Sequence, residues 1–197
     1  MILGAAALAW APRAFADAAE PEVVEPAAPP AQPAGHHFVF GQAVPILIRR
    51  LTVGYEIMPG SHHAFGLTVH GQAPGTYVPT PVKGAATGFG GEISYRFYGG
   101  SRGPSGPFVG AAFLAGGYAS APTFLAIRPQ ATHYAQYGLA LELGWAVHID
   151  RTIVLATGIG VQRTWIGVDR ERLSDFAQMV VGEGVRPRAM IQVGRIF

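Results

Sequence analysis

The 197-residue chain is long enough for one domain and is poor in charge: apolar residues make up 49% of it and Asp, Glu, Lys and Arg only 13%, where about 25% is usual in soluble domains. It has no run of the ~18–20 apolar residues that a transmembrane helix needs. A net charge of +2 without a basic stripe argues against nucleic-acid binding, and the lack of cysteine excludes disulfides and thiolate sites.

The N-terminal segment has the pattern of an export signal. Residues 2–11 form a short apolar core, and Ala14-Phe15-Ala16 supplies the small residues that a signal peptidase recognises. We therefore expect residues 1–16 to be a signal peptide, and since no basic residue precedes the core, the true start is expected to lie farther upstream. Residues 17–35 are rich in Ala, Pro and Glu, which predicts a disordered periplasmic linker.

From residue 36 onward, segments of about ten residues alternate in hydrophobicity. In 137–149 one face carries Tyr137, Leu139, Leu141, Leu143, Trp145, Val147 and Ile149. The period is two residues, which indicates strands rather than helices. The same division appears in 51–57, 65–72, 89–98 and 153–162, whereas 107–118 alternates less cleanly and leaves its facing open. Alternating segments separated by turn residues are typical of transmembrane barrels.

The connections also alternate in length. Those at 58–61, 99–106 and 150–151 are short, and those at 73–85, 119–133 and 166–185 are long, as periplasmic turns and outer loops are. An upward strand at 36–44, with a tight turn near Pro45, then brings the total to about eight. Helical spacing in 169–181, with Asp169 as a possible cap, predicts a short helix in the last outer loop; a flexible loop is the alternative.

The chain ends in the alternating sequence MIQVGRIF, with Phe197, Val193 and Ile191 on one face. This end resembles the C-terminal signal that the barrel-assembly machinery reads in bacterial outer-membrane proteins. Residues 36–197 as a whole resemble the small barrels of the OmpA and OmpX type, and still more an uncharacterised family of predicted outer-membrane barrels. The segments VGYEIMPGSHHAFGL, GGEISYRFYGG and LALELGWAVHI carry this resemblance, which implies an all-β, antiparallel up-and-down transmembrane barrel in the bacterial outer membrane.

If the large apolar side chains face lipid, the opposite positions line the lumen. The charged and histidine residues of that set are Arg50, Glu56, His70, Glu92, Arg96, Glu142, His148 and Arg188. Three carboxylates and three guanidinium groups can neutralise one another in a barrel that is just wide enough for its side chains. We therefore expect an ion network that fills the lumen, with Gly54, Gly90, Gly144 and Gly158 making room for the long Arg and Glu side chains.

These residues predict a structural or surface-interaction barrel, monomeric and without a cofactor, in contact with outer-membrane lipid and lipopolysaccharide. A catalytic Glu–His or Glu–Arg set and a lipid-modifying serine site are the enzymatic alternatives, but no serine has a convincing His or acid neighbour, so we expect no enzyme. A narrow pore and a soluble, lipocalin-like binder of an apolar ligand stay open as non-enzymatic interpretations. The pairs His36-His37 and His62-His63 suggest a metal site only weakly, because neighbouring strand residues point to opposite faces.

Overall fold

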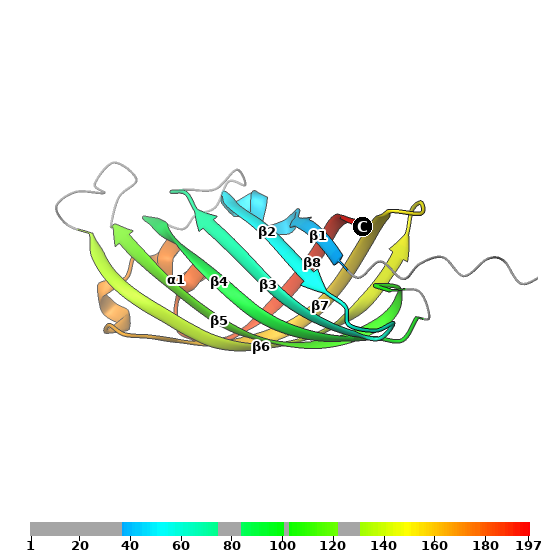
Figure 1. Cartoon of the computed structure of the whole chain (residues 1–197). Helices are drawn as coiled ribbons and strands as arrows, with labels where there is room; N and C mark the ends of the chain where they lie inside the picture. The colour runs from blue at the N-terminus through cyan, green and yellow to red at the C-terminus, as the bar shows by residue number, and fades with distance from the viewer. Residues whose placement is uncertain (1–36, 75–83, 101–102, 122–130) are drawn as a thin grey trace, which may run out of the picture. The chain divides into compact units, whose positions relative to one another are not determined.

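A computed structural model describes residues 37–74, 84–100, 103–121 and 131–197. In it, eight antiparallel strands close into a barrel in which each strand pairs with its neighbours in sequence and β1 pairs with β8 (Figure 1). The strands are β1 (His37–Gln42), β2 (Arg50–Ile57), β3 (His63–Gln72), β4 (Ala85–Tyr98), β5 (Gly106–Ala121), β6 (Thr132–His148), β7 (Ile153–Ile166) and β8 (Gly184–Ile196). The predicted all-β barrel of eight strands is confirmed. The expected signal peptide (1–16) and linker (17–35) lie outside the described residues.

The alternation in the sequence corresponds to the two faces of the barrel wall. On β6, Leu139, Leu141 and Leu143 point outward and are more than half exposed, whereas Ala140 and Glu142 between them are buried. β5, whose facing the sequence left open, follows the same rule: Phe108, Leu114 and Tyr118 point inward and are buried. The wall therefore presents its large aliphatic side chains mostly to the outside.

The registers of the eight strand pairs fix the tilt of the strands. Following paired residues around the barrel from Phe40 leads through Gly54, Thr68, Glu92, Leu114, Gly138 and Thr164 to Gly184 on β8. The β8 residue that pairs directly with Phe40 is Gly194, ten residues away (194 − 184). A stagger of this kind is the shear of a closed barrel, and it accompanies a strand tilt of roughly 35–45°.

The connections differ at the two ends of the barrel. The end formed by the connections β2–β3, β4–β5 and β6–β7, which also holds both ends of the described barrel, is called here the short-turn end. The opposite end, called the loop end, holds the connections β1–β2, β3–β4, β5–β6 and β7–β8, of which the last three are the longest in the barrel. Between β1 and β2 the expected tight turn near Pro45 is instead a 3₁₀ helix, η1 (Val44–Ile48), which ends at Arg49 in the left-handed conformation (φ 58°).

The last connection at the loop end contains the predicted helix, but the helix is shorter than expected. It is preceded by a 3₁₀ turn, η2 (Arg170–Arg172), and α1 spans Asp175–Val181. Its cap is Ser174, whose hydroxyl accepts the N–H of Ala177 at 3.2 Å, and not Asp169. A serine at this position satisfies a helix N–H that would otherwise lack a partner. Within the described residues, no helix has the length and apolarity needed to cross a membrane.

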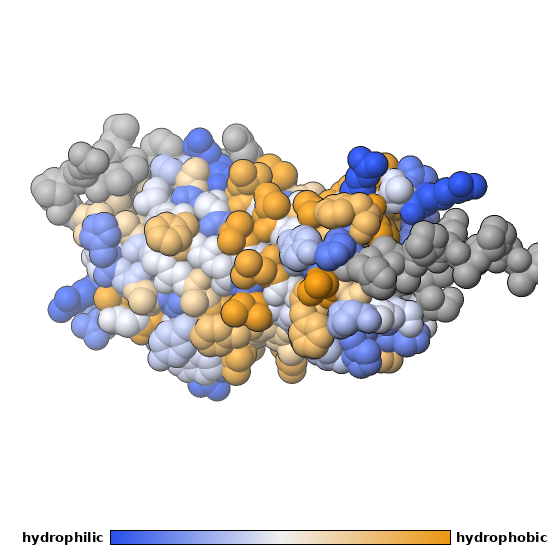
Figure 2. Space-filling model, viewed as in Figure 1, coloured by the Kyte–Doolittle hydropathy of each residue, from blue (hydrophilic) through white to orange (hydrophobic). Residues whose placement is uncertain are grey.

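The outer surface of the barrel is divided into zones. Figure 2 shows hydrophobic side chains gathered over the middle of the visible wall and hydrophilic ones at its two ends. The exposed hydrophobic residues come from all eight strands, with Val39 on β1, Leu67 on β3 and Leu141 on β6 among them. The apolar zone is therefore a belt around the barrel and not a patch on one side.

Candidate functional site

The centre of the lumen holds a buried network built around Arg96 of β4. Its guanidinium donates to the carboxylates of Glu56 on β2 and of Glu142 on β6, the latter at 2.5 Å, and to the amide oxygen of Gln192 on β8 at 2.9 Å. The Tyr98 hydroxyl donates to the other oxygen of Glu56 at 3.0 Å. All of these side chains are buried, so the charges neutralise one another away from water, as a buried ion must be neutralised.

Arg188 of β8 extends this network toward the loop end. It donates two hydrogen bonds to Glu92, at 2.6 and 3.1 Å, and lies 3.5 Å from the second oxygen of Glu142. The order Glu56–Arg96–Glu142–Arg188–Glu92 therefore alternates in charge across the lumen. The structure brings together five of the eight residues that the sequence assigned to the lumen.

The remaining three do not belong to this alternating series. Arg50 and His70 are nearer the loop end: Arg50 Nε donates to Gln72 at 3.1 Å, and a ring nitrogen of His70 lies 2.7 Å from the Tyr118 hydroxyl. The Arg50 Nη2 atom is buried and has no hydrogen-bond partner among the described residues. His148 is the last residue of β6, at the short-turn end, six positions beyond Glu142.

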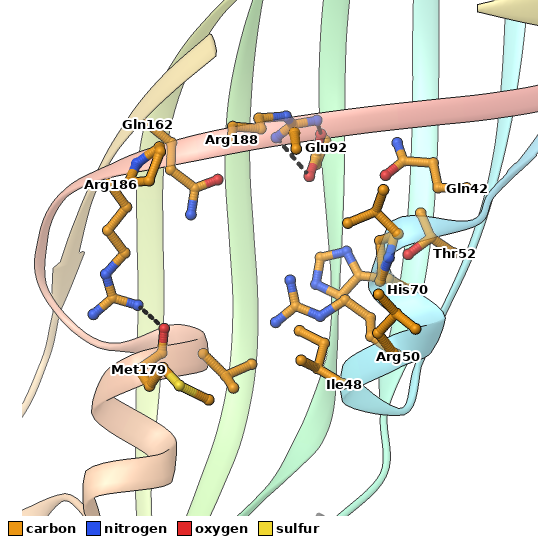
Figure 3. A pocket seen from close by; sticks show the side chains of 16 residues that line it. Gln42, Ile48, Arg50, Thr52, His70, Glu92, Gln162, Met179, Arg186 and Arg188 are labelled. Carbon is orange, nitrogen blue, oxygen red and sulfur yellow. Dashed lines mark hydrogen bonds and ion pairs between the residues drawn. The ribbon is translucent and has the colours of Figure 1, made fainter. Parts of the chain in front are cut away.

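A pocket of about 460 Å³ opens beside Arg50 and His70. Figure 3 shows both side chains projecting into the space between β8, η1 and α1, with the Arg188–Glu92 pair on the side toward β8. The wall near η1 and α1 is apolar and includes Val44, Ile48 and Val180. An apolar pocket with a few polar groups converging in it is the usual form of a small-molecule site.

Comparison with protein-family models, with curated proteins and with solved structures finds no match for this chain. Its function has to be argued from its own geometry.

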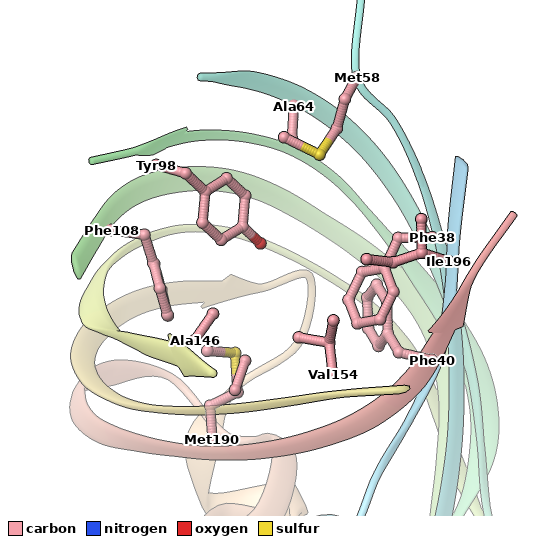
Figure 4. Close-up of a cluster of buried hydrophobic side chains, with 11 residues drawn as sticks. Phe38, Phe40, Met58, Ala64, Tyr98, Phe108, Ala146, Val154, Met190 and Ile196 are labelled. Atoms are coloured by element: carbon pink, nitrogen blue, oxygen red, sulfur yellow. The ribbon is translucent and has the colours of Figure 1, made fainter. Parts of the chain in front are cut away.

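An apolar plug fills the short-turn end of the lumen, and the sequence reasoning missed it. Figure 4 shows inward-pointing aromatic and sulfur-containing side chains from several strands. The buried set is Phe38, Phe40, Met58, Ala64, Tyr98, Phe108, Ala146, Val154, Ala156, Met190 and Ile196. Phe40 and Phe108 occupy the inward phase of β1 and β5, but the weak alternation of 107–118 left the phase of Phe108 open in the sequence.

The lumen glycines mostly serve this plug, and the expectation that they make room for the charged residues is wrong for several of them. A Cβ on Gly54 would meet the ring of Phe40, and one on Gly144 or Gly158 would approach the ring of Phe108. Gly90 faces His70 and the Tyr118 hydroxyl. The glycines beside the ion network are instead Gly66, next to Glu56, and Gly110, next to Arg96 and Glu142.

The outer rim at the short-turn end carries paired histidines and tyrosines. His37 lies 2.5 Å from the Tyr55 hydroxyl, and His63 lies 2.8 Å from that of Tyr95. Phe197 stacks on His37 at 5.9 Å, and its N–H donates to the His37 carbonyl. Among the described residues no three His, Asp or Glu side chains are grouped as a metal site would require.

The C-terminal residues proposed as an assembly signal lie on the outside of the barrel. Val193 and Ile191 point outward on β8 and are exposed, as is Phe197 just beyond its end. Their shared face is therefore accessible along the last strand, which is the strand that closes the barrel against β1.

Proposed function

We propose that this chain is a monomeric bacterial outer-membrane barrel, with its wall in lipid, its loop end outside the cell and a lumen closed by side chains, which serves a structural or surface-interaction role. The observation that carries this proposal is the belt of large apolar side chains exposed on all eight strands. Such a surface costs free energy in water and is stabilised by the hydrocarbon core of a bilayer.

The aromatic residues support this placement. Tyr95, Phe97 and Trp145 lie outward near the short-turn end, and Tyr137 and Trp165, stacked at 5.7 Å, lie outward near the loop end. On β6, Tyr137 and Trp145 are eight positions apart, which corresponds to about 26 Å along the strand and roughly 20 Å along the axis of a tilted barrel. Outer-membrane barrels carry aromatic girdles on both sides of an apolar band of about 25 Å.

The side chains that fill the lumen favour a closed barrel rather than a pore. The apolar plug fills the short-turn end, the Arg96 network crosses the centre, and α1 buries Phe176 and Val181 against Tyr118 and Tyr134 at the loop end. The lipocalin-like alternative predicts the reverse distribution, with polar residues outward and an apolar interior along the full length. The charged centre of the lumen and the apolar outer wall both argue against it.

A charge placed on the belt tests the membrane placement directly. Leu141 is 62% exposed at mid-height of β6, and Ile149 is 63% exposed in the turn at the short-turn end. In lipid, Leu141→Arg is expected to lower the free energy of unfolding by roughly 2–4 kcal/mol, and the control Ile149→Arg by no more than about 1 kcal/mol. The measurement is urea unfolding of the chain refolded into phosphatidylcholine vesicles, followed by tryptophan fluorescence.

Two further readouts complete the test. Fractionation of expressing cells should place the chain in the outer membrane, and its electrophoretic mobility should shift on boiling, as it does for closed barrels. Vesicles containing the protein should not swell in sugar solutions. A soluble chain without a heat shift, for which Leu141→Arg is harmless, would overturn the proposal in favour of the soluble binder, and rapid swelling would favour the pore.

A further inference from the structure

The barrel wall is not equally long on all sides. β1 has 6 residues and β2 has 8, whereas β4 to β7 have 14 to 17. A strand needs about 9–11 residues to cross the hydrocarbon core at the usual tilt. β1 and β2 are therefore too short to cross it, and the wall on their side ends part-way up the membrane that the proposed function requires.

This shortfall leaves a gap in the pairing between β1 and β8. Their register ends at Gln42↔Gln192, and one more bond runs from the Ala43 N–H to the Ile191 carbonyl at 2.9 Å. Among the described residues, the stretch of β8 from Gly184 to Met190 pairs with β7 alone. This gap is called here the β1–β8 notch. Pro187 lies in it, and proline, which has no N–H, is found on the free edges of sheets.

The pocket of about 460 Å³ lies at this notch. One side is η1 (Val44–Ile48), and the other is the unpaired edge of β8, where Pro187 and Ala189 line it. The inner end reaches Arg50, Thr52 and the lumen side of β3 and β4. η1 also exposes Ile46 and Leu47, so the lip of the notch is apolar.

The inner end of the pocket is cationic. Arg50 and Arg188 line it together with a single carboxylate, Glu92, which Arg188 already holds with two hydrogen bonds; Arg186 lines the pocket at α1, where it donates to the carbonyls of Met179 and Gln178. The Nη2 atom of Arg50 and the hydroxyl of Thr52 are both buried without a hydrogen-bond partner in the described part of the chain. A buried donor without a partner costs about 1–3 kcal/mol, and more when it is charged, so these atoms favour a ligand that accepts from them.

The entry route follows from what occupies the loop end. α1 packs across the lumen there, where the Gln136 amide donates to the Val181 carbonyl and the Thr164 hydroxyl to the Gly182 carbonyl, both at 2.6 Å. The notch, in contrast, lies in the barrel wall, where Pro187 and Ala189 on the unpaired edge of β8 are exposed. A ligand that passes through it meets apolar side chains first and the guanidinium of Arg50 last.

We propose that the β1–β8 notch admits an anionic amphiphile with one apolar chain from the surrounding lipid, with its headgroup accepting hydrogen bonds from Arg50 and its chain lying along η1 and α1. This inference rests on the proposed function, because only a barrel embedded in lipid has its notch at the hydrocarbon. We infer the negative charge of the headgroup from Arg50. We infer a single apolar chain from the volume of the pocket, which is within the ordinary range for small ligands.

Photolabelling tests this site. The full chain in phosphatidylcholine nanodiscs is irradiated with dodecanoate that carries a diazirine on its chain, and the labelled peptides are identified by mass spectrometry. Labelling is expected at residues 44–48 and 179–180. Excess dodecanoate should suppress it, whereas dodecan-1-ol, which lacks the charge, and acetate, which lacks the chain, should not.

Two variants and a control separate the headgroup from the cavity. Arg50→Met should reduce the specific labelling roughly tenfold or more, as expected for the loss of one charge-assisted hydrogen bond. Ala189→Trp fills the notch from an exposed position and should reduce the specific labelling to a similar extent. Arg151→Met, which removes an exposed arginine in the β6–β7 turn, should leave it unchanged.

Labelling spread evenly around the apolar belt, or equal in Arg50→Met and Arg151→Met, would overturn the inference, and so would competition by acetate alone. The heat-dependent mobility of each variant is measured in parallel. A normal heat shift with no specific labelling rejects the notch as a binding site while the membrane barrel stands. A missing heat shift in the unaltered chain rejects the proposed function itself, and with it the entry from lipid.

Discussion

The guanidinium of Arg96 on β4 donates to the carboxylate of Glu56 on β2, across the intervening strand β3, and neither side chain reaches solvent (3% and 0% exposed). The same guanidinium also donates to the carboxylate of Glu142 on β6, across the intervening strand β5. One cation thus connects three strands that are not neighbours in the sheet. Because both carboxylates depend on it, Arg96 is the residue whose loss should disturb the lumen most.

Replacing Arg96 by methionine is expected to lower the free energy of unfolding by about 3–5 kcal/mol, because it leaves buried carboxylates without their counter-charge. The measurement is urea unfolding in vesicles, with Arg151→Met as the exposed-arginine control. The triple variant Arg96→Met with Glu56→Gln and Glu142→Gln should recover a large part of the loss. An Arg96→Met chain as stable as the control would show that the network does not support the fold.

A methyl group added inside the wall should cost more than one added outside. On Gly144 a Cβ would lie 2.2 Å from the Thr157 carbonyl oxygen and 2.5 Å from the Phe108 ring, whereas on Gly71 it would meet nothing within 4 Å. Gly144→Ala is therefore expected to destabilise the barrel by about 1–3 kcal/mol, since neither the backbone nor the plug can move freely. Gly71→Ala should be neutral or slightly stabilising. Equal effects in the two variants would mean that the plug is loosely packed.

The strands were predictable because hydrophobicity that alternates from one residue to the next over many residues fits a β-strand and not a helix. The large side chains of 137–149 share a face in the sequence and share the outer wall in the structure. In the first hairpin, the second strand was predicted from the alternation in 51–57, whereas the first was inferred from the rhythm of the connections and the even count; both are present, as β2 and β1. The break near Pro45 was predicted as a tight turn, but nothing in residues 43–49 indicated that a 3₁₀ helix would take its place and leave part of β8 unpaired.

The site was predictable in composition but not in arrangement. The inward phase identified Glu56, Arg96 and Glu142 as lumen residues, but which carboxylate meets which guanidinium depends on the ten-residue stagger of the closed sheet, and no single strand carries that information. The plug was missed because the sequence assigned no facing to 36–44 and 107–118, the segments that supply its Phe side chains. Phase within the strand, and not hydrophobicity, decides the side on which Phe40 or Phe108 lies.

The cap of α1 should control how firmly the helix sits in the loop end. Ser174 accepts the Ala177 N–H and also exchanges hydrogen bonds with Ser120 on β5, at 2.9 and 3.1 Å. Ser174→Ala is expected to destabilise the helix by about 1 kcal/mol, which should increase hydrogen exchange at residues 175–181 about fivefold. Glu183→Ala, an exposed change in the same connection, should leave the exchange unaltered. If hydrogen exchange is unchanged in Ser174→Ala, the apolar face of α1 alone holds the helix in place.

The turn between β6 and β7 should make stability depend on pH in the acid range. The Asp150 carboxylate accepts the N–H groups of Thr152 at 2.6 Å and Ile153 at 2.7 Å, and these bonds hold its pKa below the usual aspartate value of about 3.9. A carboxyl whose pKa is lower in the folded than in the unfolded chain stabilises the fold above the unfolded pKa, and this contribution is lost as the pH falls through the folded pKa. Asp150→Asn, which resembles the protonated carboxyl, should therefore be less stable than the unaltered chain at pH 7, and the two should converge as the pH is lowered below about 4. Urea unfolding at a series of pH values measures this difference, and a gap of the same size at pH 3 and pH 7 would show that the charge of Asp150 does not stabilise the turn.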